Sequence, residues 1–407
     1  MRRKDFLRLG AVCGAGLVLS PLMGGRAMAA EPVATNALER QTLEMYRDWF
    51  AWLRRAGVPG FMGEHSVPNS EKGWTSQEIA KWLTLFDLAY QTLDANADVV
   101  PVVTAHAASH SSFDKGGLRI YVPTSTSGTM AARNWGRALE QAPVVERHPG
   151  TAARLRGMNA ASGAMKDKSD FGARNPGVYG TEYVYPDAAD YSYLLSRGLN
   201  VTRLPFRWER IQTRTASSPN ASPALKATEV ERLRASLDAA ASVGMKVIPS
   251  LQNYGDYIFS TSLFGSSKAE VGSSGLSISA YANFWKMLAS GAKGHPAIVG
   301  YDIMNEPGNL QGGALQWERA SQAAVDAIAS VDTNTRIWVS GYHTRHGDPG
   351  ETYNGLYSFI ENHPAPWISS PTAKFGYTSH VYYGPGAAFK WTYDEAVALW
   401  EGRGYGG

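Results

Sequence analysis

Two glutamates stand where a side chain can do chemistry. Glu306 lies near the end of Gly300–Pro307, a run that begins apolar and β-prone and stops at a proline with no N–H for a sheet. Glu64 stands in Gly60–Pro68, a second short strand pattern that delivers a glutamate. A carboxyl group at a strand end can donate or accept a proton. Taken alone, either pattern is more often a strand followed by a turn, so the surrounding elements must decide.

Helical and strand patterns alternate around these two stretches. Each predicted strand follows a predicted helix, often with a glycine between them, which favours parallel strands covered by helices. The predicted strands span residues 59–66, 98–105, 155–160, 199–205, 245–251, 300–307, 336–341 and 375–382. Eight such units predict an α/β fold, a single (β/α)8 TIM barrel. An open doubly wound sheet is the alternative, but no Gly-rich phosphate loop follows the first strand.

The composition excludes some classes of function. The 407 residues are 44% apolar and include 12 Trp and 20 Tyr, which suits a large core or a surface that stacks against flat ligands such as sugar rings. A net charge of +3 without a basic stripe argues against nucleic acid as a partner.

Residues 1–30 have the pattern of an export signal. Basic residues from Arg2 to Arg8 precede an apolar run from Leu9 to Met23 and the small-residue site Ala27-Met28-Ala29. The early arginines favour the twin-arginine route, with ordinary secretion as the alternative. We therefore expect a signal peptide at 1–30, a barrel at 31–407, and a periplasmic or secreted protein that has no membrane contact once the signal is removed. Cys13, the only cysteine, lies in the signal, so the mature chain has no disulfide.

Several motifs after residue 157 resemble one known family. The segment Asn200–Arg210 contains Arg203 in a second-strand signature, Asn305-Glu306-Pro307 forms a strand end, and His380-Val381-Tyr382 follows. From Gly157 to Tyr383 the chain thus resembles glycoside hydrolase family 5, cellulase-like enzymes with a (β/α)8 barrel.

The order of the motifs differs from that family. The resemblance implies a second glutamate at the end of the seventh strand, but only 25 residues follow Tyr382. The missing parts stand earlier, because Gly60–Pro68 resembles the seventh strand and Val99–Ala108 the eighth. We infer a circular permutation, in which strands seven and eight precede strands one to six. A truncated barrel with a fused fragment is the alternative.

The resemblance also implies roles for these residues. Glu306 would be the general acid/base and Glu64 the nucleophile of a retaining mechanism, with their carboxyl groups ~5–5.5 Å apart. Glu306 would then need a raised pKa and Glu64 a lowered one. The implied substrate-binding residues are Arg203, Asn305, His380, Tyr382, Gln252, Asn253 and His106. The histidines lack metal-ligand spacing, so we expect no metal and no other cofactor.

Two positions depart from the family pattern. Gln252 stands where a histidine usually precedes Asn-Tyr, and His106 stands where a sugar-stacking tryptophan is usual. We expect a monomeric endo-β-1,4-glucanase acting on a polysaccharide. A β-mannanase or a bacterial exopolysaccharide hydrolase is the alternative within the class. A catalytically weak polysaccharide-binding barrel is the alternative from another class.

Overall fold

A computed structural model of the chain describes residues 31–67, 75–109, 120–121, 141–164, 170–262, 265–308, 310–343, 352–385 and 392–405. The predicted signal peptide therefore lies outside the described residues and stays a prediction. A helix that the sequence also predicts, around Ala131–Glu140, lies outside them as well.

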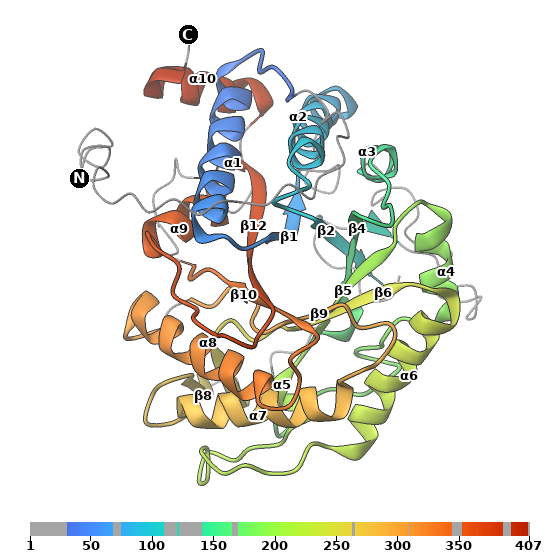
Figure 1. Cartoon of the computed structure of the whole chain (residues 1–407), viewed down its shortest axis with the longest axis vertical. Helices are drawn as coiled ribbons and strands as arrows, with labels where there is room; N and C mark the ends of the chain where they lie inside the picture. Colours follow the sequence, from blue (N-terminus) through green and yellow to red (C-terminus); the bar gives the residue numbers. More distant parts are fainter. Residues whose placement is uncertain are drawn as a thin grey trace.

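Eight parallel strands form a closed barrel (Figure 1). They are β1 (Gly60–Ser66), β2 (Val102–Ser109), β4 (Leu155–Ala160), β5 (Val201–Phe206), β6 (Lys246–Leu251), β9 (Gly300–Asp302), β10 (Arg336–Ser340) and β12 (Phe375–Pro385). The strands from β4 to β12 follow one another around the barrel in chain order. β1 then pairs in parallel with both β12 and β2, and β2 pairs with β4, which closes the ring. The predicted (β/α)8 barrel is confirmed.

Helices cover the outside of the barrel. The longer ones are α1 (Ala37–Ala56), α2 (Ser76–Ala95), α4 (Ala188–Ser196), α6 (Ala227–Val243), α7 (Ile278–Ala292), α8 (Gly313–Ala329), α9 (Gly355–Asn362) and α10 (Tyr393–Trp400). Shorter pieces are α3 (Ala142–Arg147), α5 (Trp208–Ile211), a 3-10 turn (Ala161–Gly163) and a π turn (Glu401–Tyr405). None of the described helices combines the length and apolarity needed to cross a bilayer.

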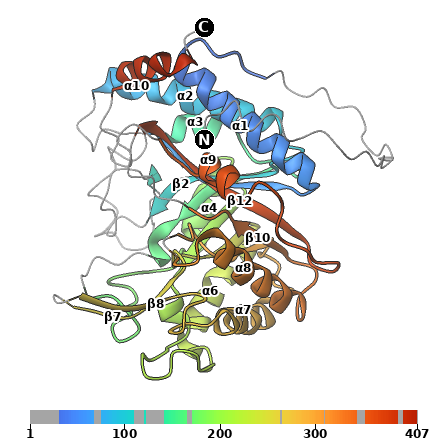
Figure 2. The same cartoon turned by 90° about the vertical axis from the view of Figure 1, so that its left-hand side faces the viewer.

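The helix ends follow the local sequence. The side chain of Asn36 accepts a hydrogen bond from Glu39 N and caps α1, which ends at Gly57 with a φ of 69°. The run Thr75-Ser76-Gln77-Glu78 predicts a capping box at the start of α2, and the side chain of Thr75 does accept a hydrogen bond from Glu78 N. The carboxylate of Glu78 accepts instead from the backbone N–H of Tyr393 and so ties α2 to the start of α10. Both figures show α1, α2 and α10 lying together (Figure 2).

An antiparallel hairpin that the sequence analysis did not predict follows β6. It consists of β7 (Asp256–Ser262) and β8 (Gly265–Glu270), which pair only with each other among the described strands. Most of β8 is exposed, so it lacks the apolar alternation that marks a strand in a sequence. Two further short strands join the barrel sheet, β3 (Ile120–Tyr121) beside β2 and β11 (Thr352–Asn354) beside β12.

Apolar side chains fill part of the barrel interior. A small buried cluster is made by one large apolar side chain from each of five strands: Phe61, Val102, Val201, Ile248 and Trp338. These five strands are spread around the closed ring, with β1 beside β2, β5 beside β6, and β10 between β9 and β12, so the cluster forms a layer inside the barrel. The polar residues of the same strands follow later in the sequence, and they therefore lie toward the carboxyl ends.

Candidate active site

Arg203 on β5 contacts both parts of the site, which are Glu64 on β1 and the residues at the end of β9 that lead to Glu306. Its side chain is fully buried, and its Nη1 donates to Glu64 Oε1 at 2.5 Å. Its Nε donates to Asp302 Oδ2 at 2.7 Å, and its Nη2 donates to Asn305 Oδ1 at 2.7 Å. A buried guanidinium needs such partners, because desolvation of an unpaired charge is costly. Arg203 therefore fixes β1, β9 and the segment after β9 relative to one another.

Glu64 is buried near the carboxyl end of β1 and is 2% exposed. β1 and β12 pair so that Glu64 stands beside His380, and the register shifts at Gly63 just before it. Its Oε2 accepts a hydrogen bond from the Tyr382 hydroxyl. His106 Nδ1 lies 3.1 Å from the same oxygen, an ion-pair distance without hydrogen-bond geometry.

The surroundings of Glu64 favour its ionised form. Burial raises the pKa of this carboxyl, but the charges of His106, His380 and Arg203 together outweigh burial. The pKa of Glu64 consequently lies well below its ordinary value, as the sequence analysis expected.

Glu306 follows β9 in a constrained backbone conformation. Its φ is 40°, in the left-handed region that residues with a side chain rarely adopt. Hydrogen bonds on both sides hold this turn, from Asn305 N to Leu251 O and from His343 N to Pro307 O, both at 2.7 Å. Such local strain persists only where the surroundings enforce it, and it is frequent at active sites.

The pKa of Glu306 differs from the expected one. Burial raises the pKa of Glu306. The hydrogen bond with His380 and the charges of His343 and His380 lower this pKa by more than burial raises it, so that it lies below the ordinary glutamate value. The expectation of a raised pKa is therefore wrong for the ligand-free protein. Its physical reason is the pair of histidines around Glu306, one of which the sequence analysis did not consider.

The two glutamates share a contact with one histidine nitrogen. His380 Nδ1 lies 2.9 Å from Glu306 Oε1 and 3.8 Å from Glu64 Oε2. These two oxygens can therefore be no more than about 7 Å apart, which fits the ~5–5.5 Å of retaining glycosidases better than most of the ~6.5–9.5 Å range of inverting ones. The fold brings together two carboxylates that are 242 positions apart in the chain.

Gln252 and Asn253, after β6, have different surroundings. Gln252 Nε2 donates to the Tyr254 hydroxyl at 3.0 Å, while its Oε1 is buried without a hydrogen-bond partner among the described residues. Asn253 is 2% exposed, and its amide is used by Glu209, Asp256 O and Trp208 N. We expected Asn253 to contact substrate, but its amide is committed to holding this loop.

Two residues near the glutamates were not selected from the sequence. His343 lies three residues beyond β10, and Tyr254 follows Asn253 with a φ of 57° and 38% exposure. Both come just after the carboxyl end of a barrel strand. The rule that singled out Glu306 would also have found them, had it been applied to every strand.

Comparisons with known proteins assign the chain to a family. Residues 149–400 match the family model described as Cellulase (glycosyl hydrolase family 5). The probable endo-beta-1,4-glucanase B of Aspergillus oryzae is 25% identical over 223 residues, covering 54% of this chain and 58% of that protein. An endoglucanase of Paenibacillus polymyxa is 32% identical over 130 residues, covering 29% of this chain and 32% of that protein.

The chain thus spans less than two thirds of the length of these curated relatives. Among solved structures, the endoglucanase Cel5A of Pseudomonas stutzeri aligns with a TM-score of 0.46 and 30% identity, covering 63% of this chain and 73% of that one. The family match covers more than half of the chain and includes Arg203, Glu306 and His380. The chain belongs to the cellulase family, glycosyl hydrolase family 5.

Proposed function

We propose that the protein hydrolyses β-glycosidic bonds in a polysaccharide, as an endo-β-1,4-glucanase with a retaining mechanism. The observation that carries the proposal is the pair Glu64 and Glu306, joined through His380 Nδ1 at the carboxyl ends of the barrel strands. This separation leaves room for a sugar carbon between a nucleophile and a proton donor. The names of the relatives, which are endoglucanases, favour a β-1,4-glucan as substrate.

The first step makes a covalent intermediate. The Glu64 carboxylate attacks the anomeric carbon while the bond to the leaving oxygen breaks, and Glu306 gives its proton to that oxygen. Arg203 holds one oxygen of Glu64 and the Tyr382 hydroxyl holds the other, so the carboxylate cannot rotate away. In the second step water attacks the same carbon, Glu306 takes the proton of that water, and Glu64 leaves.

Unpartnered polar atoms support a polyhydroxylated ligand. Asn305 Nδ2 and Gln252 Oε1 are both buried, and within the described ranges neither has a hydrogen-bond partner. A buried polar group without a partner is costly, so a sugar hydroxyl at these atoms would bind favourably. The ring of Tyr254, which is partly exposed beside them, offers a face for a sugar to stack on.

We further infer that the strand order is a circular permutation of the family order. The match to the family begins at residue 149, just before β4, whereas Glu64 lies on β1, outside the matched range. β1 nevertheless occupies the gap between β12 and β2. Because the ring is closed, there is no place in it for another seventh strand, which supports β1 in that role.

Substitution of each glutamate tests the function. Glu64→Gln and Glu306→Gln should each lower kcat on a β-1,4-glucan at least about 100-fold, measured as reducing ends released. Glu318→Gln is the matched control, because Glu318 on α8 also contacts a histidine, His363 Nδ1 at 2.8 Å, but makes no described hydrogen bond or ion pair with Glu64 or Glu306. It should keep near-wild-type activity.

A panel of polysaccharides distinguishes a β-1,4-glucanase from a β-mannanase, an exopolysaccharide hydrolase and a binding barrel without activity. Glucan, mannan and bacterial exopolysaccharides are assayed in parallel, and proton NMR of the first product identifies the anomer. A first product of β configuration supports the retaining mechanism, whereas an α product contradicts it. If the wild-type protein and Glu64→Gln bind a polysaccharide equally and neither cleaves it, the protein is a binding barrel.

A further inference from the structure

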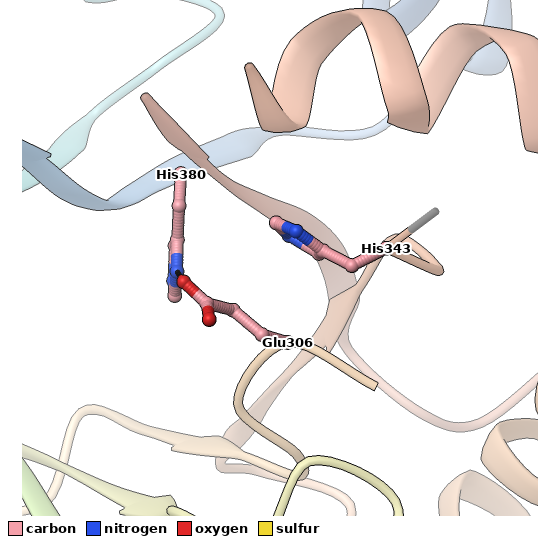
Figure 3. A group of neighbouring side chains, drawn as sticks. All are labelled: Glu306, His343 and His380. Carbon is pink, nitrogen blue, oxygen red and sulfur yellow. Dashed lines mark hydrogen bonds and ion pairs between the residues drawn. The ribbon is translucent and has the colours of Figure 1, made fainter. Parts of the chain in front are cut away.

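Glu306, His343 and His380 form a compact group that the proposed reaction does not use as a unit (Figure 3). Each offers one ligand atom, and these atoms all lie within 4.8 Å of one another. Both histidines are buried, and Glu306 is partly buried. We expected no metal from the sequence, since the histidines lack ligand spacing, yet the fold brings these three residues together from three neighbouring strand ends.

The donor types match those that bind zinc. Two imidazoles and one carboxylate are a set found in zinc sites with three protein ligands and an open position. His148 also contacts two carboxylates, Asp87 and Asp94, but these pair with Arg147, Arg154 and Arg156, so this cluster is a network of ion pairs. In the described parts of the chain, Glu306, His343 and His380 form the one group of three or more such ligands.

The backbone holds the three ligands in place. His343 N donates to Pro307 O at 2.7 Å, and Gly308 forms a parallel bridge with His343, so two ligand segments are tied together. His380 lies on β12, which pairs with β10, the strand that precedes His343. His380 Nδ1 and Glu306 Oε1 lie 2.9 Å apart, and all three ligand atoms lie within 4.8 Å of one another. Zinc–nitrogen and zinc–oxygen bonds of ~2.0–2.2 Å therefore require the ligand atoms to rearrange around the ion, a change that side-chain rotation can provide.

If His380 Nδ1 binds the ion, the hydroxyl of Thr378 is a candidate acceptor for the hydrogen on His380 Nε2. A ligating Nδ1 needs the hydrogen on Nε2, and a metal-bound histidine usually donates that hydrogen to a neighbouring acceptor. His380 Nε2 and Thr378 Oγ1 are both buried and lack hydrogen-bond partners in the described ranges. Both lie 2.7 Å from the position that a Cβ on Gly63 would occupy, so they face the same small space.

The charge of the surroundings favours a cation. Glu64, Asp302 and Glu306 carry three formal negative charges, and Arg203 pairs with the first two of them. With neutral histidines, these four groups have a formal excess of two negative charges. A divalent ion at Glu306 would compensate this excess in a site where burial weakens solvent screening.

We propose that Glu306, His343 and His380 bind a divalent transition-metal ion of the zinc type, and that the bound ion inhibits the enzyme. The inhibitory part rests on the proposed function, because it requires Glu306 to be the proton donor. A carboxylate that ligates a metal cannot at the same time carry the proton that the leaving oxygen needs. The ion is thus a reversible blocker of the site and takes no part in the reaction.

Calorimetric titration of the EDTA-treated, full-length chain with zinc chloride tests the site. We expect one ion to bind to the wild-type protein. Binding to Glu64→Gln should weaken less than about tenfold, because this variant keeps all three ligands and loses only one nearby negative charge. His343→Gln and Glu306→Gln should each weaken binding at least about tenfold, since each removes one of three ligands. His295→Gln is the matched control, because His295 contacts Asp238 on the outside of the barrel, and it should bind like the wild type. Unchanged affinity in His343→Gln overturns the proposal.

Activity assays with zinc complete the test. Zinc should inhibit the wild-type protein reversibly, with EDTA restoring the rate, and about tenfold more zinc should be needed for half-inhibition of His343→Gln. If the protein binds zinc at these residues but cleaves no polysaccharide, the metal site stands and the proposed function fails. If it cleaves polysaccharide and binds no zinc, the proposed function stands and the metal site fails.

Discussion

At the scale of single residues, the site is organised by Arg203. One guanidinium makes hydrogen bonds to three acceptors on β1, β9 and the turn that carries Glu306. Its planar fork can serve three acceptors at once, which the single ammonium of a lysine cannot do in the same geometry. Arg203 is thus needed both to keep Glu64 ionised and to keep it in position.

Arg203→Lys should therefore lower kcat/KM by about 100-fold or more, since the charge remains but the fixed geometry is lost. Arg210→Lys is the control, because Arg210 is also buried and donates to Pro176 O but contacts neither glutamate in any described hydrogen bond. Thermal unfolding of both variants is measured beside kcat/KM. Equal losses of activity at equal losses of stability would contradict a specific role for Arg203.

The pKa directions of the glutamate pair predict an acidic optimum. Glu64 must be ionised, so activity is lost as the pH falls through its folded-state pKa, which is well below the ordinary value. Glu306 must be protonated, so activity is lost as the pH rises through its pKa, which is also lowered. We expect kcat/KM, which reports the free enzyme, to fall as the pH rises from about 5 to 8.

His343→Gln tests the cause of this pH dependence. The charge of His343 lowers the pKa of Glu306, so its removal should move the alkaline limb of kcat/KM to higher pH. Profiles are measured with EDTA present, which removes any effect of bound metal. A variant whose limb stays in place, or moves to lower pH, would show that His343 does not act on Glu306.

At the scale of elements, the local sequence predicts the helices and strands of the barrel well. It predicts the contacts between helices and the inserted hairpin poorly. The caps at Asn36 and Thr75 and the strand ends at Glu64 and Glu306 follow from residues close in the chain. The contact of Glu78 with Tyr393 does not, because it depends on α10 packing beside α2. The hairpin of β7 and β8 was missed for a related reason, since β8 is mostly exposed and forms a strand by pairing with β7 rather than by burial.

Helix α4 contains a buried carboxyl that makes stability depend on pH. Burial is the main cause that raises the pKa of Asp190 to about 7, and its Oδ1 has no hydrogen-bond partner among the described residues. A raised folded-state pKa stabilises the protein at low pH, and this contribution is lost as the pH rises from about 4 through about 7.

Asp190→Asn removes the titration while it keeps the shape of the protonated acid. The variant should gain stability relative to the wild type as the pH rises from 4 to 8, by up to about 4 kcal/mol at ~1.4 kcal/mol per pKa unit. Urea unfolding at each pH measures the difference. Asp326→Asn, on the exposed face of α8, should show no such trend. A difference for Asp190→Asn that is independent of pH would refute the buried-acid explanation.

At the scale of the whole molecule, closure of the barrel creates the site. Glu64 and Glu306 meet because β1 pairs with β12, a contact between the earliest and the last strands of the barrel. Alternating patterns predict eight strands but say nothing of which distant strands become neighbours, so the pairing of the glutamates rested on resemblance to a family. His343 shows the same limit, because its importance comes from Glu306 and His380, which other strands supply.

If the strand order is a circular permutation, a chain rearranged into the family order should still adopt the same fold. The start of α1 and α10 are already joined, since Asn36 Nδ2 donates to the Tyr393 hydroxyl at 3.0 Å and that hydroxyl donates to Glu39 at 3.1 Å. A chain that runs from 149 to 405, then through a Gly/Ser linker into 31–148, restores the family order. Linkers of several lengths are compared, because closure entropy changes slowly with length.

We expect the rearranged chain to fold with a free energy of unfolding within about 3 kcal/mol of the original and to keep its activity, because the same strands still pair. The matched control is the chain 149–405 alone. It lacks β1 and β2, so it leaves the edges of β12 and β4 unpaired and has no Glu64, and it should aggregate and be inactive. Circular dichroism, urea unfolding and reducing-end release measure all three chains. A control that folds and cleaves polysaccharide without Glu64 would disprove both the permutation and the role of that glutamate.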